Sequence, residues 1–137
     1  MYALNPDAVA LVKSSAQRLR EVVGALPETL GDFIGDELVR DRVTLRLILA
    51  IQDCISIAAE VAAQKGIRPQ GGMGALFETL AHENVIPARM VLGLQEAVQV
   101  RNQILFDYDS ISPSDLYESA SSLPETLVEF LSHLSGQ

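Results

Sequence analysis

Residues 36–65 read DELVRDRVTLRLILAIQDCISIAAEVAAQK, and this run predicts one long helix from about Asp36 to Lys65. Gly66 follows it as the expected left-handed C-terminal cap. The apolar side chains are too many to share a single stripe: Val43, Leu45, Leu47, Ile48, Leu49, Ile51, Ile55, Ile57 and Val61. A helix with such wide apolar coverage lies at the centre of a bundle or is also covered by a partner chain. The sequence therefore predicts a helical bundle and raises oligomerisation as a hypothesis.

Helical signals also flank this central run on both sides. Asn5 and Pro6 form an N-cap and first-turn pair, and apolar residues then recur at spacings of three and four until about Pro27. Residues 29–35 predict a short helical turn bracketed by glycines, and residues 74–83 predict a third helix. Pro87 is expected to open a fourth helix that runs to about Asp107.

The last helix is expected to begin at Ser112-Pro113-Ser114-Asp115, which combines an N-cap, a first-position proline and an acid at the third position. Pro124 lies inside that helix and is expected to kink it or to split it into two. The sequence carries no alternating strand pattern and no internal repeat. We therefore predict an all-α, up-and-down bundle of about five helices, forming one domain over residues 1–137.

Composition excludes several classes of protein. The chain has 137 residues, of which 48% are hydrophobic, so it is too apolar for a disordered tail. Its formal net charge of −8 argues against a basic nucleic-acid module. The single cysteine, Cys54, excludes an internal disulfide and a cysteine-rich zinc site and favours a reducing compartment. Residues 47–63 are too short and too polar for a membrane span, and no targeting segment is visible, so we expect a cytoplasmic protein.

Most of the residues that could perform chemistry favour structural interpretations. His82 and His133 have no metal-ligand partner at i+3 or i+4, so we expect no zinc site and assign both to structural or surface roles. Cys54 is expected to be a buried small hydrophobe. The loop at residues 68–74 lacks the Gly-Lys-Ser/Thr of a phosphate-binding loop, and no cofactor is expected. Paired carboxylates are interpreted as solvated acids: Asp36/Glu37, Asp107/Asp109 and Glu125/Glu129.

An arginine cluster on the long helix leaves two interpretations open. Arg40, Arg42 and Arg46 are close together in sequence. An acidic chain repels RNA phosphates except where arginines gather, so this cluster is a candidate for phosphate contact. We favour the alternative, a solvated face paired with acids.

The segment at residues 100–108, VRNQILFDY, is unusual because it places polar residues at the end of a mostly aliphatic helix. Arg101 and Tyr108 are seven residues apart and are therefore expected to share one helix face, as are Asn102 and Phe106 at a spacing of four. In a purely structural interpretation, Arg101 pairs with an acid such as Asp107 and Asn102 caps a chain end. In a functional interpretation, the same residues form a site.

This segment resembles the Arg-Asn-x-x-x-His-x-Tyr signature of HepT-like proteins, which are helical ribonucleases of the HEPN superfamily. Three other stretches resemble that family in order and spacing: LPETLGDF at 26–33, GIRP at 66–69, and FETL at 77–80 followed by VIP at 85–87. The resemblance covers about residues 8–134.

The resemblance implies a homodimer of helical bundles whose two motifs line a shared cleft. It further implies metal-independent RNA cleavage by a toxin whose antitoxin, the nucleotidyltransferase MntA, silences it by transferring AMP to the motif tyrosine. By position, Arg101 would bind the scissile phosphate, Asn102 would orient the site, and Tyr108 would accept AMP. No membrane contact is expected.

This chain departs from the signature at Phe106, which stands where the family has histidine. Loss of general acid–base catalysis costs a factor of about a hundred to ten thousand in rate. We therefore expect a catalytically weak or degenerate HepT-like toxin that an MntA-like nucleotidyltransferase still binds. Two alternatives stay open: an active ribonuclease with a non-standard base, and a non-catalytic helical dimerisation or adaptor protein without an RNA substrate.

Overall fold

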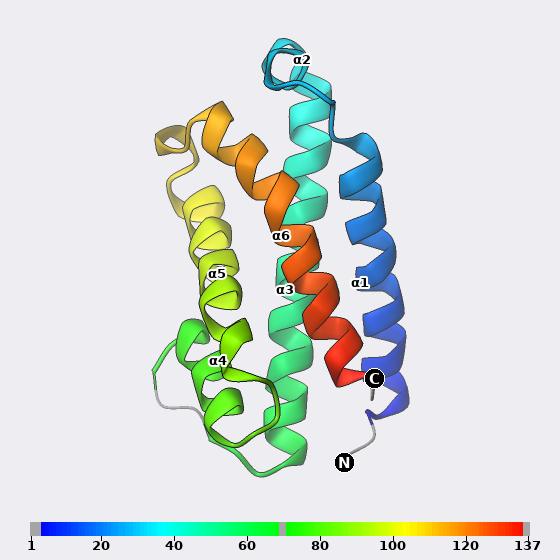
Figure 1. Ribbon diagram of the computed structural model, residues 1–137, viewed down its shortest axis with the longest axis vertical. Helices are drawn as coiled ribbons and strands as arrows, with labels where there is room; N and C mark the ends of the chain where they lie inside the picture. The colour runs from blue at the N-terminus through cyan, green and yellow to red at the C-terminus, as the bar shows by residue number, and fades with distance from the viewer. Residues whose placement is uncertain (1–3, 69–70, 136–137) are drawn as a thin grey trace.

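The computed structural model describes residues 4–68 and 71–135, and in them every regular element is helical. Six α-helices and two short 3-10 turns follow one another (Figure 1): α1 Pro6–Ala25, α2 Leu30–Gly35, α3 Glu37–Gln64, α4 Met73–His82, η1 Ala88–Met90, α5 Val91–Phe106, η2 Tyr108–Ser110 and α6 Pro113–Leu134. The five predicted helices and the predicted short turn all occur. The all-α prediction is therefore confirmed.

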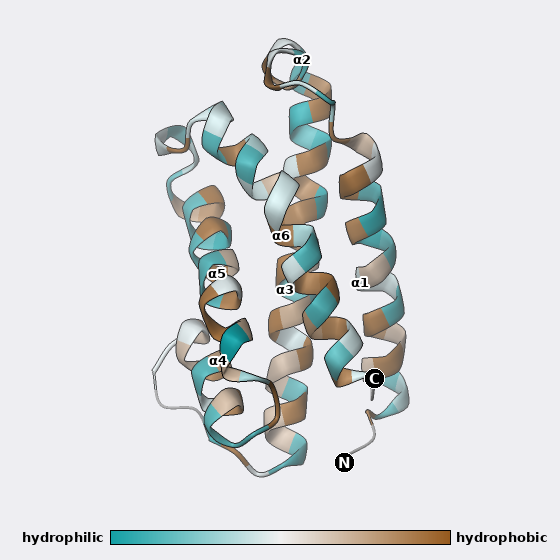
Figure 2. Cartoon of the chain, viewed as in Figure 1, coloured by the Kyte–Doolittle hydropathy of each residue, from teal (hydrophilic) through white to brown (hydrophobic). Residues whose placement is uncertain are grey.

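Helix α3 is the centre of the bundle. Helices α1 and α6 pack against it and against each other, while α4 and α5 pack beside its C-terminal half and against α6 (Figure 1). Eleven of its residues are buried, which accounts for its wide apolar coverage. Along α1 and α6, apolar and hydrophilic residues alternate with the spacing of amphipathic helices (Figure 2). One contiguous apolar core results.

Local sequence signals set most helix ends. The Oδ1 atom of Asn5 accepts a hydrogen bond from the Ala8 N–H at 2.8 Å, and the Oγ atom of Ser112 accepts one from the Asp115 N–H at 3.0 Å. Gly66 adopts φ 68°, and the Ile67 N–H then reaches the Ala62 carbonyl at 2.8 Å. The predicted caps at these ends are confirmed.

One detail of the prediction is wrong, and one of two alternatives is excluded. Pro87 does not open α5; it precedes the 3-10 turn η1, in which the Val91 N–H bonds to the Ala88 carbonyl before α5 begins. Such turns are common at helix N-termini. Pro124 does not split α6, which is continuous through it. Pro124 and its neighbour Leu123 are buried against the core, so packing offsets the loss of one helical hydrogen bond.

The described helices include none that combines the length and apolarity needed to cross a bilayer. The part of the predicted loop at residues 69–70 lies outside the described residues. Cys54 is fully buried on α3, as expected.

Candidate functional site

The end of α5 carries the polar residues that the sequence singles out. Arg101 is half-buried, and its Nη1 atom donates to the Oδ1 atom of the exposed Asn102 at 2.7 Å. The Nε atom of Arg101 is buried without a hydrogen-bond partner. In the described part of the chain Arg101 forms no ion pair, so the expected pairing with Asp107 is absent. Its positive charge is therefore available to an anion.

Phe106 is the last residue of α5, and 78% of its surface is exposed. A phenyl ring has no proton to give or take, so this position supplies no acid or base. The exposure shows that core packing does not use Phe106.

Tyr108 does not share a helical face with Arg101, because α5 ends before it. Asp107 adopts φ −154° and ψ 48°, and the chain then enters the 3-10 turn η2. The predicted face relation is therefore wrong for Tyr108, since helical spacing has no meaning across this break. Two side-chain hydrogen bonds add to the backbone bonds of the turn: Gln103 Nε2 donates to Ser110 Oγ at 3.1 Å, and Ser110 Oγ donates to the Asp107 carbonyl at 2.8 Å.

The turn places Tyr108 at a groove that the beginning of α3 also lines. An open groove of about 230 Å³ is lined by Arg40, Tyr108, Asp109, Ile111, Pro113 and Leu116. Tyr108 keeps 43% of its surface exposed there. Sequence reasoning missed this pairing of Arg40 with Tyr108, because the two residues are far apart in the chain and no local pattern links them.

The arginine cluster of α3 is divided among three environments. Arg46 forms an ion pair with Glu21, which confirms the acid-paired interpretation for that residue. Arg40 instead donates to the carbonyls of Phe33 and Ile34 at the end of α2, so the same interpretation is wrong for it. Arg42 is exposed.

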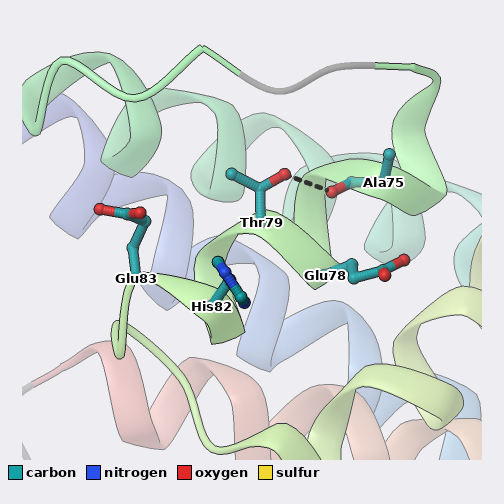
Figure 3. Close-up of a pocket in the computed structure, with 5 residues that line it drawn as sticks. All are labelled: Ala75, Glu78, Thr79, His82 and Glu83. Carbon is teal, nitrogen blue, oxygen red and sulfur yellow. Dashed lines mark hydrogen bonds between the residues drawn. The ribbon is translucent and has the colours of Figure 1, made fainter.

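The two histidines lie away from this site. His133 stands in the last turn of α6, where its Nε2 atom is 3.1 Å from the Val85 carbonyl. His82 ends α4 and lines an open pocket of about 350 Å³ with Ala75, Glu78, Thr79 and Glu83 (Figure 3). No three metal-binding side chains among the described residues gather into a metal site.

Helix α5 begins beside η1 and α4 and ends at Phe106 (Figure 1). At the usual helical rise its 16 residues span about 24 Å. His82 ends α4, at the N-terminal end of α5, and His133 contacts Val85 just before η1. Both histidines are therefore at the far end of α5 from Phe106 and do not replace the missing imidazole.

Buried polar groups occur elsewhere, between α1 and α3. Burial raises the pKa of the Cys54 thiol to about 12, against a lowering by the hydroxyl of Ser15. Burial also raises the pKa of Asp53, and the Arg18 guanidinium, with Nη1 3.3 Å from Asp53 Oδ2, partly offsets this rise. The thiol therefore stays protonated near neutral pH and is a poor nucleophile.

Comparison with known protein families shows to which family the chain belongs. A model of the family described as ribonuclease HepT-like matches residues 12–134. The chain belongs to the HepT-like family. Among curated proteins, none matches this sequence.

Several solved structures, two of them toxin–antitoxin structures, share this fold. A tri-AMPylated HEPN toxin of Shewanella oneidensis, in complex with an MNT antitoxin, superposes with a TM-score of 0.80 at 22% identity, over 98% of this chain and all of that one. A toxin–antitoxin structure named MntA–HpeT, with a tyrosine-to-alanine mutation, gives 0.84 at 17% identity over 97% of this chain and 100% of that one. The cytosolic protein YutE of Bacillus subtilis, of unknown function, gives 0.66 at 14% identity over 88% and 87% of the two chains.

Proposed function

We propose that this protein is the toxin component of a toxin–antitoxin pair, with metal-independent RNA cleavage that is weak or lost. The observation that carries the proposal is the last two turns of α5. They hold Arg101, which has no ion pair among the described residues, and an exposed phenylalanine instead of an acid–base residue. Family membership supports RNA as the substrate class, and the toxin–antitoxin names of the structural neighbours support the biological role.

In this proposal Arg101 and Asn102 bind and orient the scissile phosphate. Cleavage without a metal requires a group that removes the proton of the ribose 2′-hydroxyl and another that protonates the leaving oxygen, and imidazole suits both tasks at neutral pH. Phe106 performs neither. Arg101 alone lowers the charge of the phosphate but transfers no proton, so RNA binding persists while turnover falls.

We assign Tyr108 as the residue that a nucleotidyltransferase antitoxin of the MntA type modifies with AMP. Its exposure supports access by a partner enzyme. Tyr117 is a poor alternative, because its hydroxyl donates to the Pro27 carbonyl at 2.6 Å and its ring packs against Phe33. Tyr2 lies outside the described residues.

A homodimer is the second element of the proposal. Five large apolar side chains are exposed on α3 and α5: Leu38 at 81% and Leu45 at 57% on α3, and Leu92 at 80%, Leu105 at 45% and Phe106 at 78% on α5. Leu92 and Phe106 are fourteen residues apart, close to four helical turns, and share a face of α5. A second copy that covers these side chains would remove their apolar surface from water. In keeping with the family resemblance, we propose that the two motifs of such a dimer line a shared cleft. A cytoplasmic location agrees with this role.

RNA cleavage by the purified protein in a chelator tests the proposal. We expect little cleavage by the unaltered chain and an increase of about a hundredfold or more for Phe106→His. The double variant with Arg101→Ala should lose that gain, because phosphate binding would be removed. Phe106→Leu serves as the matched control, since it changes the side chain without adding a proton-transfer group.

Two results would contradict the proposal. Strong cleavage by the unaltered chain that disappears in Arg101→Ala would indicate an active ribonuclease with a non-standard base. The absence of both RNA binding and cleavage in the unaltered chain and in Phe106→His would favour the dimerisation or adaptor function instead.

A further inference from the structure

The groove beside Tyr108 contains a cation, a hydroxyl and an apolar wall that the proposed RNA site does not use. Arg40 comes from α3, Tyr108 from η2, and the apolar residues Ile111, Pro113 and Leu116 come from the junction of η2 with α6. We propose that this groove receives the AMP group after its transfer to Tyr108, with Arg40 as the residue that binds its phosphate. The inference rests on the proposed function, because it requires Tyr108 to be the modified residue.

Arg40 is held in place before any nucleotide arrives. One of its terminal nitrogens, Nη1, donates to the Phe33 carbonyl at 3.5 Å and to the Ile34 carbonyl. A guanidinium has five N–H donors, so this contact leaves donors on its other nitrogens. Its conformational freedom is already restricted, which lowers the entropic cost of binding an anion.

The charge of Arg40 is not neutralised by a carboxylate. Within the described residues, the ion pairs of arginine involve Arg18, Arg46 and Arg89, and Arg40 is not among them. Asp109 lines the same groove and opposes an anion there. The groove therefore offers one free positive charge and one acid whose removal should strengthen phosphate binding.

The modification creates the group that fits this charge. The phenolic oxygen of Tyr108 attacks the α-phosphorus of ATP and forms a new O–P bond. The bond from the α-phosphorus to its bridging oxygen breaks, pyrophosphate leaves, and the phenolic proton is released to solvent. The product is a phosphodiester with one negative charge, and hydrogen bonds from a guanidinium to phosphate are of the strong, charge-assisted kind. Ile111 and Pro113 supply the accessible apolar surface for the adenosine, while Leu116 lies buried at the base of the groove.

Removal of AMP by an added phosphodiesterase tests the inference on protein that has been AMPylated by co-expression with a nucleotidyltransferase of the MntA type. We expect Arg40→Ala to release AMP about two- to fivefold faster than the unaltered chain, the range of an exposed charge pair. Asp109→Asn should release it more slowly. Arg42→Ala is the matched control, because Arg42 is exposed on the same helix and does not line the groove.

A second measurement separates nucleotide binding from the structural role of Arg40 at the end of α2. The melting temperature of each variant is compared with and without AMP, so that the loss of the α2 contact cancels. AMPylation should raise the melting temperature of the unaltered chain and of Arg42→Ala more than that of Arg40→Ala.

The outcomes distinguish this inference from the proposed function. If mass spectrometry finds no AMP on Tyr108 of the unaltered chain, the proposed modification fails and this inference fails with it. If Tyr108 carries AMP but release is equally fast in the unaltered chain, Arg40→Ala and Asp109→Asn, the proposed modification stands and this inference is overturned. Should Arg40→Ala not fold, Asp109→Asn decides alone, because no hydrogen bond or ion pair between the described residues links Asp109 to α2 and slower release is still expected.

Discussion

Three of the four phenylalanines of this protein lie inside the bundle, while the fourth stands in solvent at the end of α5. Phe33, Phe77 and Phe130 are at most 1% exposed, against 78% for Phe106. The buried rings have partners: Phe77 and Phe130 meet edge to face with centroids 5.6 Å apart, and Phe33 packs on Tyr117 at 5.2 Å. Phe106 has no such contact with another described ring.

This difference separates the part of the molecule that folding requires from the part that it leaves free. Aromatic burial and edge-to-face contact stabilise the centre of the bundle. An exposed phenyl ring adds nothing comparable and leaves apolar surface in water. Stability therefore explains Phe33, Phe77 and Phe130 but not Phe106, whose explanation lies in an interface or in a changed site.

Among the substitutions at Phe130, Gly93 and Phe106, Phe130→Ala should have the largest effect on stability. The side chain is fully buried on α6 and its loss leaves a cavity beside Phe77, so we expect a decrease of about 3–5 kcal/mol in the free energy of unfolding. Urea denaturation followed by circular dichroism measures it. Val23→Ala on α1, where Val23 is 61% exposed, is the control and should change the value by less than about 0.5 kcal/mol. A loss below about 1 kcal/mol for Phe130→Ala would contradict a close-packed core at this position.

Gly93→Ala should have an intermediate effect on the free energy of unfolding. This substitution tests how closely α5 and α6 pack. A Cβ atom at Gly93 would lie 2.9 Å from the Cγ2 atom of Thr126, and that β-branched side chain has little rotamer freedom in a helix. We expect overpacking to cost about 1–3 kcal/mol, reduced in part by the better helix propensity of alanine.

Two variants sharpen the test at Gly93. Thr126→Ser removes the clashing methyl group, so the double variant should recover most of the lost stability. Gly24→Ala on α1 is the matched control: nothing lies within 4 Å of its added Cβ, and it should stabilise the protein by about 0.4–1 kcal/mol. Equal effects at Gly24 and Gly93 would show that the α5–α6 contact tolerates a methyl group.

The sequence predicted most of the bundle because its helix ends rest on local signals. Asn5, Ser112 and Gly66 act within three or four residues of their own positions, and burial explains the apolar width of α3. The error at Pro87 and the excluded split at Pro124 both concern a local preference of proline. Pro124 stays inside a continuous helix because the core covers it, which depends on residues distant in sequence.

The candidate site was predictable only in part for the same reason. Arg101, Asn102 and Phe106 are neighbours in one helix, so their motif is visible in the sequence. The place of Tyr108 depends on the break at Asp107 and on the Gln103–Ser110 hydrogen bond, which helical spacing does not anticipate. Its groove also needs Arg40, which is sixty-eight positions earlier in the chain and is fixed by carbonyls of α2.

Phe106→Ala should have the smallest effect on folding, although it removes the same ring as Phe130→Ala. With 78% of its surface exposed, the side chain gives up little contact, and the unfolding free energy of a single chain should change by less than about 0.5 kcal/mol. The urea midpoint is measured at two protein concentrations tenfold apart, since dimerisation would make it depend on concentration. We expect the urea midpoint of Phe106→Ala to match that of the unaltered chain at the lower concentration and to fall below it at the higher one, where the proposed dimer covers the ring.

An equal decrease of the midpoint at both concentrations would mean that Phe106 stabilises the single chain, and Phe106 and Phe130 would then differ only in how much they stabilise it. No loss at either concentration would remove Phe106 from the proposed dimer interface.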